Sequence, residues 1–238
     1  LGEGLATRRD TSGEPAPHWW HDPHNAERAV ERIGAELVDT APGAAGPDDA
    51  QRIFACFDQP DLKAPITLTA TTPPGWTVRA NGAGFQTAPG RWQFAATPPI
   101  STYLMTIIAG PYHLIEDRHD GIALGLLCRR SLAPHLHTDA TEILEITRSC
   151  LDRYHEMFGI RYPFGKYDQA FVPELSLGAM ENPGCVTFRD EFIFRSAVTD
   201  ADREERAVVI AHEMAHMWFG NLVTLRWWDD IWLNESFA

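Results

Sequence analysis

The pattern of hydrophobic and polar residues changes twice along the 238-residue chain. Residues 1–50 are rich in Pro, Gly, Ala, Asp and His, with one short helical pattern over 26–37, and predict a loop-like segment. Over residues 51–130, short β-branched or aromatic runs are separated by Pro and Gly. Two of these runs, ITLTA and WTVRA, alternate as half-buried strands do, so this part predicts a β-rich N-terminal domain.

From residue 131 to residue 238 the apolar positions recur with helical spacing. Thr138 is a candidate N-cap for a first helix, which Gly159 would end. A second, mostly apolar and interior helix is expected over 202–219, and a third begins near residue 229 and is still running at the last residue. The fold class expected from this order is α+β, with a β-rich domain followed by an α/β domain.

Composition narrows the class of protein. A hydrophobic fraction of 44% is enough for a large core, and a net charge of -13 provides no basic surface for nucleic acid. No apolar run approaches the ~20 residues that span a bilayer, and no secretory signal is visible, so no membrane partner is expected. Widely spaced cysteines favour a reduced, cytoplasmic environment; they are Cys56, Cys128, Cys150 and Cys185.

The strongest chemical signal is HEMAH, residues 212–216, within the second expected helix. His212 and His216 are four residues apart and therefore lie one above the other on a helix face, where both imidazoles can bind one ion. Glu213 lies one step around the helix, where it can contact a water on that ion. The competing interpretation, two histidines that make hydrogen bonds in a core, is weakened because the preceding run VVIA is apolar and a buried His or Glu needs a partner.

A third ligand is available on the next helix. Glu235 lies 19 residues after His216, whereas the Gly and His that a metzincin requires after its second His are Phe219 and Leu222 here. Three protein ligands leave the fourth zinc position open, which is typical of a catalytic site. One Zn²⁺ per chain is therefore expected, with Glu213 as the general base that takes a proton from the activated water.

The second signal is GAMEN, residues 178–182. Together with HEMAH, Glu235 and the stretches CFDQPDLKAP, LGAMENPG and WWDDIWLNESFA, it makes the chain resemble the M1 family of zinc aminopeptidases, the gluzincins related to aminopeptidase N. The resemblance covers roughly residues 51–238. It implies that residues 51–130 are part of a β-rich N-terminal domain and that residues 131–238 are a C-terminally truncated, thermolysin-like zinc peptidase domain.

The resemblance also implies a role for each residue of GAMEN. In such enzymes the segment is an extended edge that pairs with the substrate backbone, and its glutamate, here Glu181, binds the free α-amino group. Backbone groups of Gly178 and Ala179 would hold the scissile residue, and Met180 and Asn182 complete the substrate-binding segment. The expected partners are therefore peptides with a free N-terminus. The sequence does not indicate an oligomeric state or the preferred N-terminal residue.

The chain departs from the family pattern in two places. The family has an oxyanion-stabilising Tyr downstream of the third zinc ligand, and every tyrosine here precedes HEMAH. Gly46 falls where relatives have a Glu or Gln that helps to bind the amine, and residues 1–50 match poorly. Two alternatives to an aminopeptidase stay open: a catalytically inert zinc-binding fragment, and a thermolysin-type endopeptidase that has no use for Glu181.

Overall fold

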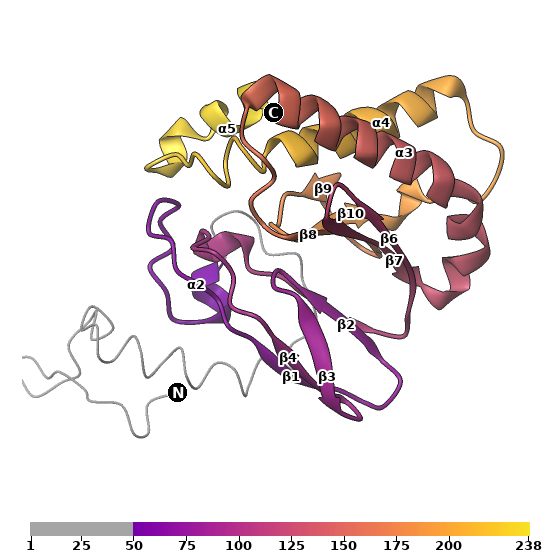
Figure 1. Cartoon of the computed structure of the whole chain (residues 1–238), viewed down its shortest axis with the longest axis horizontal. Coiled ribbons are helices and arrows are strands. Elements are labelled where there is room, and N and C mark those ends of the chain that lie inside the picture. The colour runs from indigo at the N-terminus through magenta and orange to yellow at the C-terminus, as the bar shows by residue number, and fades with distance from the viewer. Residues whose placement is uncertain (1–49) are drawn as a thin grey trace, which may run out of the picture.

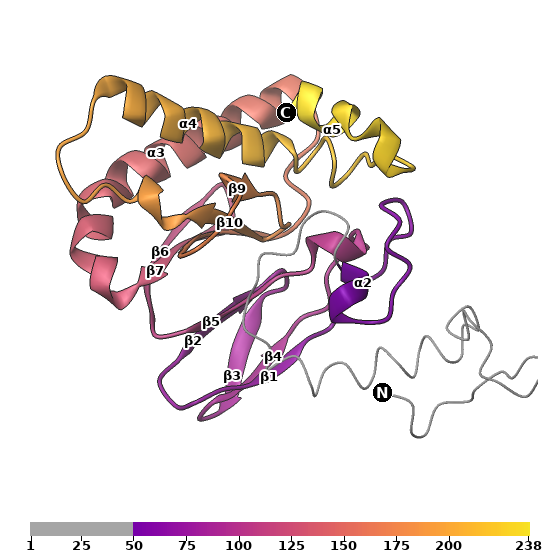
Figure 2. The same ribbon diagram turned by 180° about the vertical axis from the view of Figure 1, so that it is seen from behind.

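The computed structural model describes residues 50–238, shown from two opposite sides in Figures 1 and 2. The expected loop-like segment, its helical pattern over 26–37 and Gly46 lie outside the described residues, except that Ala50 begins a short helix. The α+β expectation is confirmed, because a β-rich N-terminal part precedes a part that combines helices with a sheet. None of the helices within 50–238 has the length and apolar character needed to cross a bilayer.

The elements follow one another as a β-rich half and a mixed half. The strands are β1 (Thr69–Thr71), β2 (Thr77–Ala80), β3 (Gly84–Ala88), β4 (Arg91–Phe94), β5 (Ile107–Gly110), β6 (Tyr112–His119), β7 (Ile122–Arg129), β8 (Lys166–Val172), β9 (Ala179–Met180) and β10 (Cys185–Arg189). The helices are α2 (Ala50–Ile53), α3 (Ala133–Phe158), α4 (Asp200–Ala215) and α5 (Trp232–Phe237), and the short 3₁₀ helices include η2 (Thr102–Leu104) and η5 (Trp228–Asp230).

Three sheets organise the described chain. The N-terminal part contains a three-stranded sheet with the order β1-β4-β3 and a two-stranded sheet of β2 and β5, all antiparallel. The third sheet has five strands in the order β6-β7-β8-β10-β9. Its inner strands β7, β8 and β10 are parallel, while β6 and β9 run antiparallel to them at the two edges.

The five-stranded sheet crosses the expected domain boundary at residue 130. Strands β6 and β7, which the sequence analysis placed in the N-terminal domain, pair with β8 of the following part. The reason is that β7 is buried on both faces, and a doubly buried strand belongs in the interior of a sheet that is covered on both sides. The boundary between the sheets therefore lies before β6 rather than after β7.

Both faces of this sheet are covered by other parts of the chain, so its inner strands are buried along nearly their whole length. On one face Leu126, Phe171 and Phe188 pack against α3 and α4, which lie side by side across the sheet. On the other face Leu127 and Ala170 pack in one cluster with Ile108 of β5, in the N-terminal part. Successive residues of a strand point to opposite faces, so a single strand can serve two cores at once.

The helix boundaries differ from those expected. The expected N-cap at Thr138 is wrong, because α3 already begins at Ala133. Pro134 lies in the first turn, where the N–H that a proline lacks would have no partner within the helix. The expected stop at Gly159 is confirmed by its left-handed φ of 64°. Helix α4 begins behind a capping box between Thr199 and Asp202, and it is not interior, since Val208 is 60% exposed.

Candidate metal centre and active site

The two histidines of HEMAH come together at the C-terminal end of α4. His212 is the first of the pair and His216 caps the helix, and their rings meet edge to face with centroids 4.5 Å apart. The two Nε2 atoms are 3.0 Å apart. Nδ1 of His216 lies 3.0 Å from the carbonyl oxygen of Phe219, and it must be the donor because a carbonyl only accepts. The proton is therefore on Nδ1, and the lone pair of Nε2 is available to bind a metal ion.

Glu235 completes the group from α5. Its Oε2 atom lies 3.3 Å from Nε2 of His212 and 3.7 Å from Nε2 of His216. The hydrogen bond from His212 lowers the pKa of the Glu235 carboxyl, and the positive charge that either histidine can carry acts in the same direction. His212 and Glu235 are partly exposed, whereas His216 is buried, so the three ligand atoms face one another at a place open to solvent.

These distances fit a single zinc ion. Two ligand atoms bound to zinc at a tetrahedral angle, with bonds of about 2.05 Å, lie about 3.3 Å apart. The three separations among His212, His216 and Glu235 are 3.0, 3.3 and 3.7 Å. Two imidazoles and one carboxylate are also ligands that zinc prefers in catalytic sites. The predicted ligands are thus brought together in a geometry that a zinc ion would satisfy.

A close approach of the chain supports this geometry. Gly220 has a φ of 118°, a conformation open to glycine and strained for other residues. A side-chain carbon at this position would lie 3.1 Å from Nδ2 of Asn234 and 3.4 Å from Nδ1 of His216. The absence of a side chain at Gly220 therefore lets the turn after α4 pass between His216 and the helix that carries Glu235.

Glu213 is buried beside the candidate zinc ligands. Its side chain is 5% exposed, and its Oε2 atom has no hydrogen-bond partner within the described part of the chain. Burial raises the pKa of the Glu213 carboxyl well above its usual value, and the nearby carboxylates of Glu181 and Glu235 raise it further. A divalent cation at the three ligands would oppose this rise, because it favours the charged carboxylate.

The GAMEN segment lies on an open edge of the five-stranded sheet. Its strand β9 pairs on one side with β10, through Ala179 opposite Phe188 and Met180 opposite Thr187, and it is the last strand in the order. The carbonyl oxygen of Gly178 accepts from the backbone N–H of Arg189 at 3.1 Å. Since backbone groups of alternate residues point to opposite sides of a strand, those of Ala179 point to the free edge.

Glu181 follows directly after this strand and lies beside the candidate zinc ligand His216. A carboxylate oxygen of Glu181, one of Glu213 and a ring nitrogen of His216 all lie within 4.8 Å of one another. Glu181 is 7% exposed. The predicted anchor for the α-amine and the predicted base are therefore neighbours, although 32 residues separate them in the sequence.

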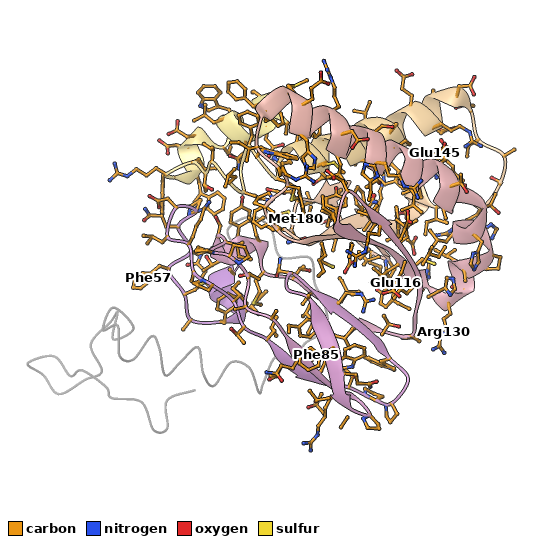
Figure 3. All side chains as sticks on the ribbon, viewed as in Figure 1. Phe57, Phe85, Glu116, Arg130, Glu145 and Met180 are labelled. Atoms are coloured by element: carbon orange, nitrogen blue, oxygen red, sulfur yellow. The ribbon has the colours of Figure 1, made fainter. Side chains whose placement is uncertain are left out.

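The side chains of two GAMEN residues, Met180 and Asn182, make buried contacts with other parts of the chain. Met180 packs with Tyr103 and Leu104 near the middle of the molecule, where Figure 3 labels it. Asn182 is 4% exposed, and its Nδ2 donates to the carbonyl of Leu104 while its Oδ1 accepts from the hydroxyl of Thr187. The side chains of Met180 and Asn182 therefore fix the strand end in place, a structural use that the sequence analysis did not anticipate.

Three further residues that the sequence analysis did not select reach this site. Asn221 donates to the carbonyl of Glu181 at 2.8 Å, Lys63 donates to the carbonyl of Asn221 at 2.6 Å, and the hydroxyl of Tyr103 donates to Oε1 of Glu181 at 3.3 Å. All three contacts join distant parts of the chain. Local spacing carries no signal for such contacts, so the sequence pattern could not have identified them.

Comparison with protein families gives matches over both halves of the chain. The Peptidase M1 N-terminal domain matches residues 44–104, and the Peptidase family M1 domain matches residues 142–238. The second match includes HEMAH, GAMEN and Glu235, and the first includes the segment that carries Lys63 and Tyr103.

Individual relatives agree with this result. The chain is 53% identical over 194 residues to aminopeptidase N of Streptomyces lividans, covering 80% of this chain and 22% of the relative. It is 37% identical over 214 residues to probable M1 family aminopeptidase 1 of Encephalitozoon cuniculi, with 81% and 23% covered, and 37% identical over 201 residues to human aminopeptidase N, with 80% and 21% covered. The chain thus spans about a fifth of the length of these relatives. With both family domains matched in order along the chain, the chain belongs to peptidase family M1.

Proposed function

We propose that this chain provides the zinc-binding and amine-binding residues of an aminopeptidase that removes the N-terminal residue from peptides. The observation that carries the proposal is the placement of the Glu181 carboxylate within 4.8 Å of Glu213 and the zinc-ligand candidate His216. The relatives named aminopeptidase support the same activity.

The distance between anchor and metal ligands selects the bond that is cut. The α-amino nitrogen and the carbonyl carbon of one residue are two bonds apart, about 2.5 Å. An ammonium group held by Glu181 therefore brings the first peptide bond, and not a later one, next to His212, His216 and Glu235. A site for internal peptide bonds has no need of a buried carboxylate at this place, which favours an exopeptidase over the endopeptidase alternative.

Each step of the proposed hydrolysis is assigned to a small number of groups at this site. Zinc held by the two histidines and Glu235 would polarise the scissile carbonyl and lower the pKa of a water molecule. Glu213 would take the proton of the attacking water and pass it to the departing amine, because its carboxylate lies beside His216 and its Oε2 atom has no hydrogen-bond partner among the described residues. Backbone groups of Ala179 at the edge of β9 are placed to pair with the substrate backbone.

The proposal is tested with the zinc-loaded protein on alanine p-nitroanilide, with a free and with an acetylated amine. We expect release of p-nitroaniline from the free amine only. Glu213→Gln should lower kcat by ~10²–10⁴-fold while the zinc content stays at one ion per chain. Glu204→Gln, which changes an exposed glutamate on the same helix, is the matched control and should leave kcat unchanged.

Two outcomes would point to the alternatives. Equal cleavage of the free and the acetylated substrate would contradict the exopeptidase assignment and favour an endopeptidase. Zinc binding without turnover in any variant would favour a catalytically inert zinc-binding protein.

A further inference from the structure

The Glu181 carboxylate has a partner that comes from the N-terminal part of the chain. Tyr103, in the 3₁₀ helix η2, donates its hydroxyl to Oε1 of Glu181 at 3.3 Å across 78 residues of sequence. Both side chains are 7% exposed. A hydrogen bond to a carboxylate that is shielded from water is stronger than one between neutral groups, so this contact can hold the carboxylate in one orientation.

The hydroxyl of Tyr103 is itself fixed by packing. Its ring meets Trp228 edge to face with centroids 5.0 Å apart and an interplanar angle of 71°. The indole N–H of Trp228 donates in turn to the carbonyl of Asp58 at 3.3 Å. Tyr103 also packs in one apolar cluster with Leu104 and Met180. The ring therefore has little freedom to swing the hydroxyl away from Glu181.

The backbone of Glu181 is held separately from its carboxylate. Asn221, in the turn after α4, donates to the Glu181 carbonyl at 2.8 Å, and Lys63 donates to the carbonyls of Asn221 and Leu222 at 2.6 and 3.2 Å. The main chain at Glu181 is thus tied to the helix of the zinc ligands. The remaining freedom at this residue is rotation of its own side chain.

That rotation matters because the Glu181 carboxylate lies within 4.8 Å of a carboxylate oxygen of Glu213 and a ring nitrogen of His216. A rotated Glu181 side chain would no longer place its carboxylate beside the groups that act on the first peptide bond. A neutral phenol can hold one oxygen of Glu181 without neutralising its charge, and the other oxygen stays available to a cationic amine. A lysine or arginine in the same position would compete with the substrate amine for this carboxylate.

We propose that Tyr103 is a positioning residue that holds the Glu181 carboxylate in the orientation needed to bind the α-amine of the substrate. This role rests on the proposed aminopeptidase function. It also gives the N-terminal part of the chain a direct share in substrate recognition.

The test is a double-mutant cycle in the full-length, zinc-loaded protein. Tyr103→Phe removes only the hydroxyl and keeps the ring that packs on Trp228. We expect KM for alanine p-nitroanilide to rise by about 10-fold with little change in kcat, because the lost hydrogen bond orients the amine anchor and does not contact the reacting bond. In a Glu181→Ala background the same substitution should have no further effect on KM.

The control is Tyr154→Phe, which removes a half-buried hydroxyl that donates to the carbonyl of Ala211 at 3.0 Å, away from Glu181. It should leave KM unchanged, and zinc content and thermal unfolding should confirm that all variants are folded. An unchanged KM in Tyr103→Phe, or an equal loss with and without Glu181, would overturn the role of Tyr103 while the aminopeptidase function stands. A wild-type protein without activity towards the free amine would remove the proposed function, and the role of Tyr103 with it.

Discussion

At the scale of single residues, a buried arginine holds the helix that carries two of the candidate zinc ligands. Arg206 on α4 is 0% exposed, and its Nη1 atom donates to Asp139 at 2.7 Å and to the carbonyl of Phe192 at 3.0 Å. Its Nη2 atom lies 3.0 Å from Glu142, and its guanidinium stacks 4.0 Å from the centre of the Phe194 ring. This cluster joins α4 to α3 and so fixes the helix that carries His212 and His216.

Removal of the Arg206 guanidinium should lower the stability of the folded protein. Arg206→Met leaves Asp139, which is 5% exposed, as a buried charge without its cation, so the free energy of unfolding should fall by ~3–5 kcal/mol. The measurement is chemical denaturation. Arg203→Met, which removes a 47% exposed guanidinium that pairs with Glu142, is the control and should cost ~0–1 kcal/mol. Equal losses in the two variants would show that burial of Asp139 is not the cause.

At the scale of elements, the candidate zinc site joins helix α4 to helix α5. Helix α4 has a capping box and packs on the sheet, and it carries His212 with His216 at its end, whereas Glu235 comes from α5. Glu235 is the only candidate zinc ligand on α5 among the described residues, so binding of the ion is expected to hold α5 against α4.

Zinc should therefore stabilise the protein and order α5 in particular. With free zinc at ~1,000 times Kd, the free energy of unfolding should rise by about 4 kcal/mol, and chelation should reverse the gain. Hydrogen exchange should slow at the amides of α5 and stay unchanged in the central strand β7. Glu235→Ala should weaken both effects, while Glu204→Ala should not. Equal protection of α5 with and without zinc would contradict this account.

At the scale of the whole molecule, buried polar residues connect the N-terminal sheets to the five-stranded sheet. Arg79 on β2 places Nε 3.5 Å from Asp168 on β8, which also pairs with Lys166 at 2.8 Å. Asn81, directly after β2, donates to the carbonyls of Leu104 and Pro183 at 2.9 and 3.0 Å and accepts from the N–H of Thr106 at 2.8 Å. These bonds reach the segment that directly follows GAMEN.

Asn81→Ala would leave the carbonyl of Pro183 and the N–H of Thr106 without their partner in a site that is 4% exposed, whereas the carbonyl of Leu104 would still accept from Asn182. The free energy of unfolding should fall by ~2–4 kcal/mol, because each unpaired buried group retains its desolvation cost. Thermal or chemical unfolding measures the change. Gln93→Ala, on an exposed position of β4, is the control and should alter stability by less than ~0.5 kcal/mol. A loss no larger than that of the control would show that Asn81 does not connect the two parts.

The sequence by itself determined what depends on short-range geometry. The spacing of His212 and His216 places both imidazoles on one helix face, and Gly159 ends a helix because glycine adopts a positive φ without strain. Only the tertiary structure decided what depends on contacts between distant segments. It placed β6 and β7 in the five-stranded sheet, showed α4 to be half exposed over a buried Arg206, and brought Tyr103 to Glu181. The physical reason is that burial and pairing at such positions follow from which faces meet in the folded chain, and residue periodicity contains no information on that choice.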